Sequence, residues 1–125
     1  MTILPMLSGC YFFLPFIEVT QNVPPTIDLS SPADGSDLVF RGEQETAFVI
    51  ALDEDGDSLS FVWTIEGHGE QPYAVQFQSE GLQGSQLTLV READFDDRVL
   101  SVSVYDPQGD SARRSWTIDV PEGSQ

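Results

Sequence analysis

Short segments rich in β-branched and aromatic residues recur along most of the chain, separated by clusters of Gly, Asp, Pro and Ser. Segments of this length and spacing are typical of antiparallel strands packed as a sandwich. One short segment, Glu92–Phe95, is predicted to form a helical turn instead of a strand. The pattern predicts an all-β domain over residues 26–120, with about seven to eight strands: Thr26–Leu29, Asp37–Phe40, Thr46–Leu52, Leu59–Ile65, Tyr73–Gln78, Gln86–Val90, Val99–Tyr105 and Ala112–Val120.

Alternation of apolar and polar residues within three segments identifies side chains that should face the core. These are Leu59, Phe61, Trp63 and Ile65, then Leu100, Val102 and Val104, then Trp116, Ile118 and Val120. Trp63 and Trp116 are the predicted core anchors, because each indole buries roughly 150–250 Å². Residues 47–52 are apolar on both faces, so alternation leaves their register open. A domain of about 95 residues buries over 60% of its unfolded surface and needs no disulfide.

The charge of the chain is one-sided, with 21 Asp and Glu against five basic residues, all of them Arg, and a formal net charge of −16. Binding to nucleic acid depends on basic side chains that displace counterions from phosphates, so we expect no nucleic-acid partner. Electrostatic docking on an anionic membrane is excluded for the same reason. The acidic excess should keep the surface soluble and separate copies apart.

The only cysteine, Cys10, ends the sequence Leu7-Ser8-Gly9-Cys10. This sequence resembles the lipobox of bacterial lipoproteins, where a signal peptidase cuts before a cysteine that carries a diacylglycerol. The resemblance implies that residues 1–10 are a truncated lipoprotein signal and that lipid on Cys10 is the membrane contact. Nine residues precede Cys10 and none is basic, so a complete signal would start upstream of Met1. The alternative is an ordinary cysteine in an apolar tail.

Residues 11–25 are predicted to tether the domain. Their first half, Tyr11–Ile17, is apolar and aromatic, but it is too short to span a bilayer, which takes about 20 residues. Beside an acylated cysteine we expect it to lie unstructured at the headgroup level, where aromatic rings are favoured. Glu18–Pro25 is polar and ends in two prolines, as in a short stiff linker. Residues 121–125 are predicted as a C-terminal tail.

Four segments, Asn22–Ile27, Ser31–Gly35, Ala51–Trp63 and Val102–Asp110, come in the order found in bacterial PKD and cadherin-like domains. The chain resembles these domains over about three quarters of its length. The most specific part is the Asp-x-Asp-Gly-Asp-x-Leu-x-Phe-x-Trp run that ends at Trp63. The resemblance implies an immunoglobulin-like β-sandwich. The chain departs from the PKD pattern at residues 64–67 and at Arg98, where an aromatic residue is usual.

The acidic loop of residues 53–57 is the leading candidate site. It offers four carboxylates within five residues, and Ca²⁺ takes six to eight oxygen ligands from such loops. In an immunoglobulin-like topology, the loops after Asp53 and Asp106 lie at the end where the chain enters. The sequence therefore predicts a calcium site whose ligands are Asp53, Asp55, Asp57, Asp106, Asp110 and the carbonyl of Asn22. The alternative is that these aspartates only shape the turn.

Catalysis has little support in the sequence. His68, the only histidine, lies between two glycines, and we expect a solvated turn residue that is poorly held for general-base chemistry. The chain has no nucleophile elbow, HExxH motif, phosphate loop or paired zinc ligands. Arg113 and Arg114 are expected to be solvated on opposite faces of the last strand. The alternative is that they pair with the acidic excess or rim an interface.

The sequence favours a non-enzymatic, lipid-anchored protein of the bacterial cell envelope, periplasmic or surface-exposed, whose single domain acts as a binding module or a spacer. In the bacterial lipoproteins that the motif resembles, an aspartate after the cysteine retains some members at the inner membrane. Tyr11 occupies that position here, so the resemblance implies the outer membrane. An envelope protein or polysaccharide is the expected partner. Two alternatives remain open: a calcium-dependent adhesion or assembly module, and an accessory domain of a secreted hydrolase system.

Overall fold

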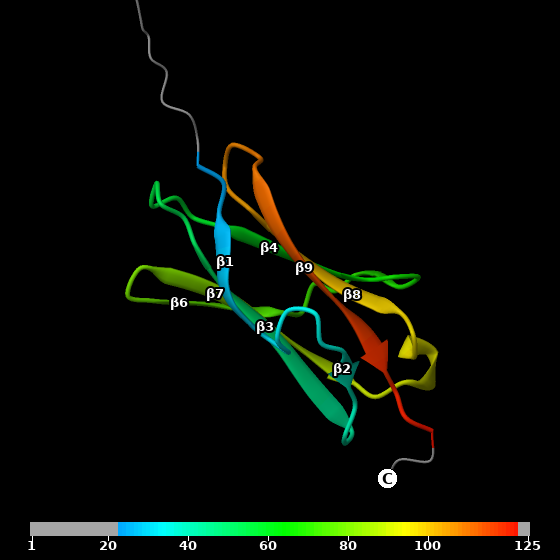
Figure 1. Cartoon of the computed structure of the whole chain (residues 1–125). Helices are drawn as coiled ribbons and strands as arrows, with labels where there is room; N and C mark the ends of the chain where they lie inside the picture. Colours follow the sequence, from blue (N-terminus) through cyan, green and yellow to red (C-terminus); the bar gives the residue numbers. More distant parts are fainter. Residues whose placement is uncertain (1–22, 123–125) are drawn as a thin grey trace, which may run out of the picture.

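The computed structural model describes residues 23–122, which form two β-sheets packed face to face (Figure 1). The four-stranded sheet has the order β1-β3-β7-β6, and the five-stranded sheet has the order β2-β9-β8-β4-β5. The 3-10 turn η1 (Ala93–Phe95) precedes β8. The strands are β1 (Thr26–Ser31), β2 (Leu38–Val39), β3 (Gln44–Leu52), β4 (Ser60–Ile65), β5 (Gly69–Glu70), β6 (Val75–Ser79), β7 (Leu82–Val90), β8 (Val99–Tyr105) and β9 (Ser111–Asp119).

This strand order is that of immunoglobulin sandwiches, in which strands A, B, E and D form one sheet and G, F and C the other. The prediction of an all-β, immunoglobulin-like sandwich is therefore confirmed. The first part of the chain contributes to both sheets, because β1 pairs antiparallel with β3 and β2 pairs parallel with β9. As a result, the chain enters the sandwich at one end and leaves β9 at the opposite end (Figure 1).

Most strand boundaries differ from the predicted ones by one or two residues, and β7 and β5 differ more. β7 begins at Leu82 rather than Gln86, because the left-handed residues Glu80 and Gly81 form a tight hairpin that pairs Ser79 directly with Leu82. β2 is only two residues long. β5, which pairs with the end of β4, was not predicted, because two residues are too few to show alternation.

The core lies between the sheets and is centred on the two tryptophans. Trp63 and Trp116 are each 1% exposed, and their rings stack with centroids 6.0 Å apart. Trp63 Nε1 donates to Ser85 Oγ at 2.8 Å, and Trp116 Nε1 donates to the carbonyl of Pro32 at 2.9 Å. On β3 the buried side chains are Ala47, Val49 and Ala51, which settles the register that alternation left open.

Arg91 joins three segments at the end of the sandwich where β9 finishes. Its guanidinium donates to the carbonyls of Phe40 at 3.4 Å, Gly42 at 3.2 Å and Pro121 at 2.6 Å. The loop before β3 and the residues after β9 are thereby tied to the end of β7. Within residues 23–122, no helix is long and apolar enough to cross a membrane.

Candidate functional site

The acidic loop between β3 and β4 gathers three carboxylates. Asp53, Asp55 and Asp57 each offer an oxygen, and these oxygens lie within 4.8 Å of one another. Asp53 shapes the turn, since its Oδ1 accepts from the Asp55 backbone N–H at 2.7 Å and its carbonyl accepts from Gly56 at 3.0 Å. This is the role that the turn alternative assigned to it.

The second oxygen of Asp53 has a different environment. Asp53 is 6% exposed, and its Oδ2 has no hydrogen-bond partner among the described residues. Leaving a buried carboxylate oxygen unpaired is unfavourable, because it loses its hydration without replacement. Turn formation does not account for this oxygen, whereas a cation held by the cluster would satisfy it.

The loop between β8 and β9 repeats this geometry. Asp106, which is 5% exposed, accepts through Oδ1 from the backbone N–H groups of Gln108 at 3.0 Å and Asp110 at 2.9 Å. Asp110 lies in the same turn, and its carbonyl accepts from the Asp106 N–H at 3.0 Å. Both acidic loops therefore begin with a buried aspartate directly after a strand.

Electrostatics link the two loops through Asp57. Desolvation in the turn, together with the charges of Asp53, Asp55 and Asp106, raises the pKa of Asp57 above its ordinary value of 3.8. The folded state then holds the Asp57 proton more tightly than the unfolded state, so stability falls as the pH rises through this raised pKa. At neutral pH the charged Asp57 opposes folding, and a bound cation would reverse that effect.

The entry of the chain reaches the same loop. The backbone N–H of Val23 donates to Asp55 Oδ2 at 3.3 Å, so the start of the described chain lies against the acidic cluster. Asn22 and Cys10, the other predicted site residues, lie outside the described residues. The structure thus brings the loops of Asp53 and Asp106 and the entering chain to one end of the sandwich (Figure 1).

A buried glutamine that the sequence analysis missed holds the acidic loop in place. Gln83, on β7, accepts through Oε1 from the Leu59 N–H at 2.9 Å and donates through Nε2 to the Asp57 carbonyl at 2.9 Å. Gln76 Nε2 adds a bond to the Leu59 carbonyl at 3.2 Å. The available signal was the alternation of Gln83, Ser85, Leu87 and Leu89, which places a glutamine on the inward face of β7.

We expect Gln83→Leu to lower the free energy of unfolding by about 2 kcal/mol, because it removes two hydrogen bonds and leaves the Leu59 N–H unpaired. The melting temperature, followed by circular dichroism, should fall by roughly 8–16 °C in a domain of this size. Gln76→Leu, which loses one bond from an exposed side chain, is the matched control and should have a smaller effect. An unchanged melting temperature in Gln83→Leu would show that the amide does not hold the loop.

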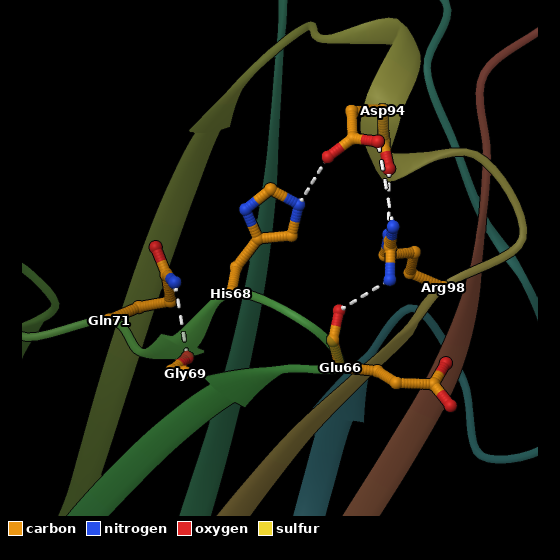
Figure 2. A network of polar contacts seen from close by, with 6 residues as sticks. All are labelled: Glu66, His68, Gly69, Gln71, Asp94 and Arg98. Carbon is orange, nitrogen blue, oxygen red and sulfur yellow. Dashed lines mark hydrogen bonds and ion pairs between the residues drawn. The ribbon is translucent and has the colours of Figure 1, made fainter.

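A second polar cluster lies at the other end of β4 (Figure 2). His68 Nε2 is 2.8 Å from Asp94 Oδ2, and the imidazole meets the Phe95 ring edge-on at 5.0 Å. Arg98 contacts Asp94 as well and donates to the Glu66 carbonyl at 3.4 Å. A Cβ on Gly67 would lie 2.2 Å from Arg98 Nη1, so only glycine fits there without displacing the guanidinium.

His68 is exposed in its turn, as expected, but the expectation of a poorly held imidazole is wrong. The His68 side chain is 28% exposed and joins the β4–β5 turn to η1. Its partner lies in a turn remote in sequence, which local patterns do not reveal. Among residues 23–122, its contacts are a carboxylate and a phenyl ring rather than a nucleophilic hydroxyl, so the cluster acts as a link between loops.

Arg114 pairs with an acidic side chain, the alternative to the solvated position expected for it. It lies on the inward side of β9, half-buried, with Nε 3.7 Å from Asp34 Oδ1 and Nη2 3.5 Å from the Ile27 carbonyl. Its guanidinium therefore links β9 to β1 and to the turn that follows β1. Arg113 lies on the outward side, is exposed, and donates to Ser101 Oγ at 3.1 Å.

Comparison with known proteins identifies the fold. No protein-family model and no curated protein matches this sequence. The chain is similar in structure to titin domain M4, with 16% identity over 82% of this chain and 100% of that chain and a TM-score of 0.54. Titin domain M7 matches with 13% identity over 82% of this chain and 99% of that chain, at a TM-score of 0.56.

A third similar structure is the N-terminal Ig1-2 module of the Drosophila receptor protein tyrosine phosphatase DLAR. Its identity to the chain is 19%, its TM-score is 0.56, and the match covers 82% of this chain and 52% of that chain. Identities this low establish the fold alone. The domain therefore has an immunoglobulin-like fold.

Proposed function

We propose that the protein is a non-enzymatic, lipid-anchored protein of the bacterial cell envelope whose immunoglobulin-like domain acts as a binding module or a spacer. The observation that carries the proposal is the Leu7-Ser8-Gly9-Cys10 motif, followed by an apolar stretch and a polar linker that leads into the domain. Lipid on Cys10 would supply the membrane contact, since two or more acyl chains anchor a protein stably.

The domain itself supports a binding role rather than chemistry. Its buried polar side chains, such as Gln83 and Ser85, bond to other parts of the fold. Immunoglobulin-like sandwiches recognise partners through their loops and exposed sheet edges. We therefore expect an envelope protein or a polysaccharide as the partner. The tether of about 15 residues would limit how far from the membrane the domain can meet it.

Metabolic labelling tests the anchor. Cells expressing the protein from a reading frame with a complete signal should incorporate radioactive fatty acid into it, and Cys10→Ser should incorporate none. The variant should melt at the same temperature as the unlipidated parent, which separates loss of lipid from loss of fold. Label that persists in Cys10→Ser, or no label in the parent, would contradict the proposal.

One observation favours a second candidate, a calcium-dependent adhesion or assembly module. The unpaired, buried Oδ2 of Asp53 lies in a cluster of three carboxylates, and Asp106 acts on the same cluster. These oxygen donors are the type that Ca²⁺ prefers. Asp53, Asp55 and Asp57 would hold the ion, with Asp106, Asp110 and the Asn22 carbonyl as the further ligands predicted from the sequence.

Calcium should raise the melting temperature. For a dissociation constant of about 10⁻⁴–10⁻³ M, typical of extracellular modules, about 10 mM Ca²⁺ adds roughly 1.4–2.7 kcal/mol. The melting temperature should then rise by roughly 6–22 °C. Asp57→Asn should abolish this rise, yet it should melt above the parent in chelator at neutral pH, because it removes the charge that opposes folding.

Asp28→Asn serves as the control, because Asp28 is an exposed carboxylate on β1 outside the cluster. It should keep the full response to calcium. Identical melting curves of the parent in calcium and in chelator would remove this second candidate and leave the lipid anchor untouched.

A further inference from the structure

The outward faces of the two sheets differ sharply in polarity. On the five-stranded sheet, the outward side chains paired across β4, β8 and β9 include Thr64, Ser101 and Ser115. On the four-stranded sheet, a set of large apolar side chains points away from the core, here called the outer apolar face: Leu29, Ile50, Leu52, Val75, Phe77 and Leu82.

The register makes this face continuous. Leu29 pairs with Ile50, Ile50 with Gly84, and Gly84 with Phe77, so one apolar row crosses all four strands. The Phe77 ring lies over Gly84, where a Cβ would be 2.3 Å from its ring atoms. The absence of a side chain at Gly84 therefore lets the ring of β6 extend over β7. Val75 is 61% exposed and Leu29 is 52% exposed.

The face also lacks charge. Neither β6 nor β7 contains an acidic or basic residue, although the chain has 21 Asp and Glu. On β3 the one charged residue, Glu45, pairs with the inward Leu89, and on β1 the only charge is Asp28 at the edge bulge. A contiguous, charge-free apolar surface of this kind marks a site that another apolar group covers.

The net charge of the chain indicates which apolar group covers the outer apolar face. A second copy would bring a net charge of −16 against another −16, and an anionic lipid surface would meet the same repulsion. A segment of the same chain adds no such charge. Residues 11–17, Tyr-Phe-Phe-Leu-Pro-Phe-Ile, are apolar and uncharged.

The connection to the sheet permits this contact. Residues 18–25 join Ile17 to Thr26, the first residue of β1, and β1 is the edge strand of the same sheet. Because Val23 is held against the acidic loop, residues 18–22 are the free part of this connection. Five residues reach at most about 16–18 Å, and the four strands lie across about 14 Å. A covalent link of this length keeps the segment close to the sheet, so modest apolar contacts suffice.

We propose that residues 11–17 fold back over the outer apolar face and cover it. Aromatic side chains of the segment pack against the row formed by Leu29, Ile50 and Phe77. The proposal concerns the unlipidated chain, and it holds whether or not Cys10 is a lipidation site. In the proposed contact, residues 11–17 lie against protein instead of being exposed to water.

The single cysteine provides the test. A nitroxide attached to Cys10 of the unlipidated full chain should broaden the amide NMR signals of β6 and β7, relative to the same sample after reduction of the nitroxide. The signals of Ser101 and Ser115, on the outward side of the other sheet, should keep their intensity. Broadening that is absent, uniform, or confined to the start of β1 would overturn the proposal.

Two further arms complete the test. The double variant Leu29→Ser with Val75→Ser should lose the localised broadening, whereas Val62→Ser, outward on β4, should keep it. Both changed positions of the double variant are more than half exposed, so the fold should tolerate them. As a test for contact between copies, chains that carry the nitroxide without isotope enrichment are mixed with isotope-enriched chains that carry no nitroxide. The NMR signals of the enriched chains should stay sharp. Broadening there would show that the segment binds a second copy and would overturn the contact within one chain.

Discussion

Trp63→Ala should lower the free energy of unfolding by about 3–5 kcal/mol, the usual loss when a fully buried tryptophan is truncated. Trp63 is 1% exposed, stacks on Trp116 and donates to Ser85 Oγ. Alanine leaves a cavity between the sheets and a buried hydroxyl without its donor. Domains of this size have a total stability of about 5–15 kcal/mol, so the variant should lose a large fraction of its stability.

Urea unfolding followed by circular dichroism measures this loss without relying on the removed fluorophore. Trp63→Phe keeps a ring in the core and removes the hydrogen bond, so its loss should be smaller, about 1–2 kcal/mol. A double-mutant cycle with Trp116→Ala should give a coupling of about 0.5–1.5 kcal/mol from the stacked rings. Loss below about 1 kcal/mol in Trp63→Ala would contradict the central place of this residue in the core.

Arg91→Met should lower the free energy of unfolding by about 3 kcal/mol. Hydrogen bonds from a charged donor contribute about 1.5–3 kcal/mol each, and partial exposure of Arg91 reduces the sum over its three carbonyl partners. Methionine retains most of the aliphatic stem, so the loss reports the guanidinium. Hydrogen exchange should accelerate first at the Phe40 N–H, which bonds to the Asp119 carbonyl in the segment that Arg91 closes.

The matched control is Arg41→Met, on the loop that precedes β3. The Arg41 side chain is exposed, and the residue donates to Glu45 through its backbone N–H, which the substitution keeps. Its loss should stay below about 0.5 kcal/mol. Equal losses in the two variants would mean that removal of positive charge, rather than the contacts of Arg91, decides the outcome.

The fold class was predictable because three strands, β4, β8 and β9, have one buried and one solvated face. That asymmetry is written in the alternation around Trp63, Val102 and Trp116. Strand β3 shows no such alternation, because its outward residues Phe48 and Ile50 are as apolar as its inward residues Ala47 and Val49. Only pairing with β1 and β7 decides which side faces the core.

The candidate site was predictable in composition and only partly in geometry. Asp53, Asp55 and Asp57 are neighbours in sequence, so their clustering follows from one tight turn. The unpaired Oδ2 of Asp53 and the support from Gln83 depend on burial and on a strand remote in sequence. The link from His68 to Asp94 is equally remote. Lipidation of Cys10, the calcium site and the PKD or cadherin-like subtype stay predictions.

The parallel pairing of β2 with β9 has a mechanical consequence. Because these two strands run in the same direction, the described chain begins and ends at opposite ends of the sandwich. A pull applied between Val23 and Glu122 therefore runs along the strands and shears them past one another. Under such a load the bonds of a ladder must rupture together instead of unzipping one at a time, a geometry suited to transmitting tension.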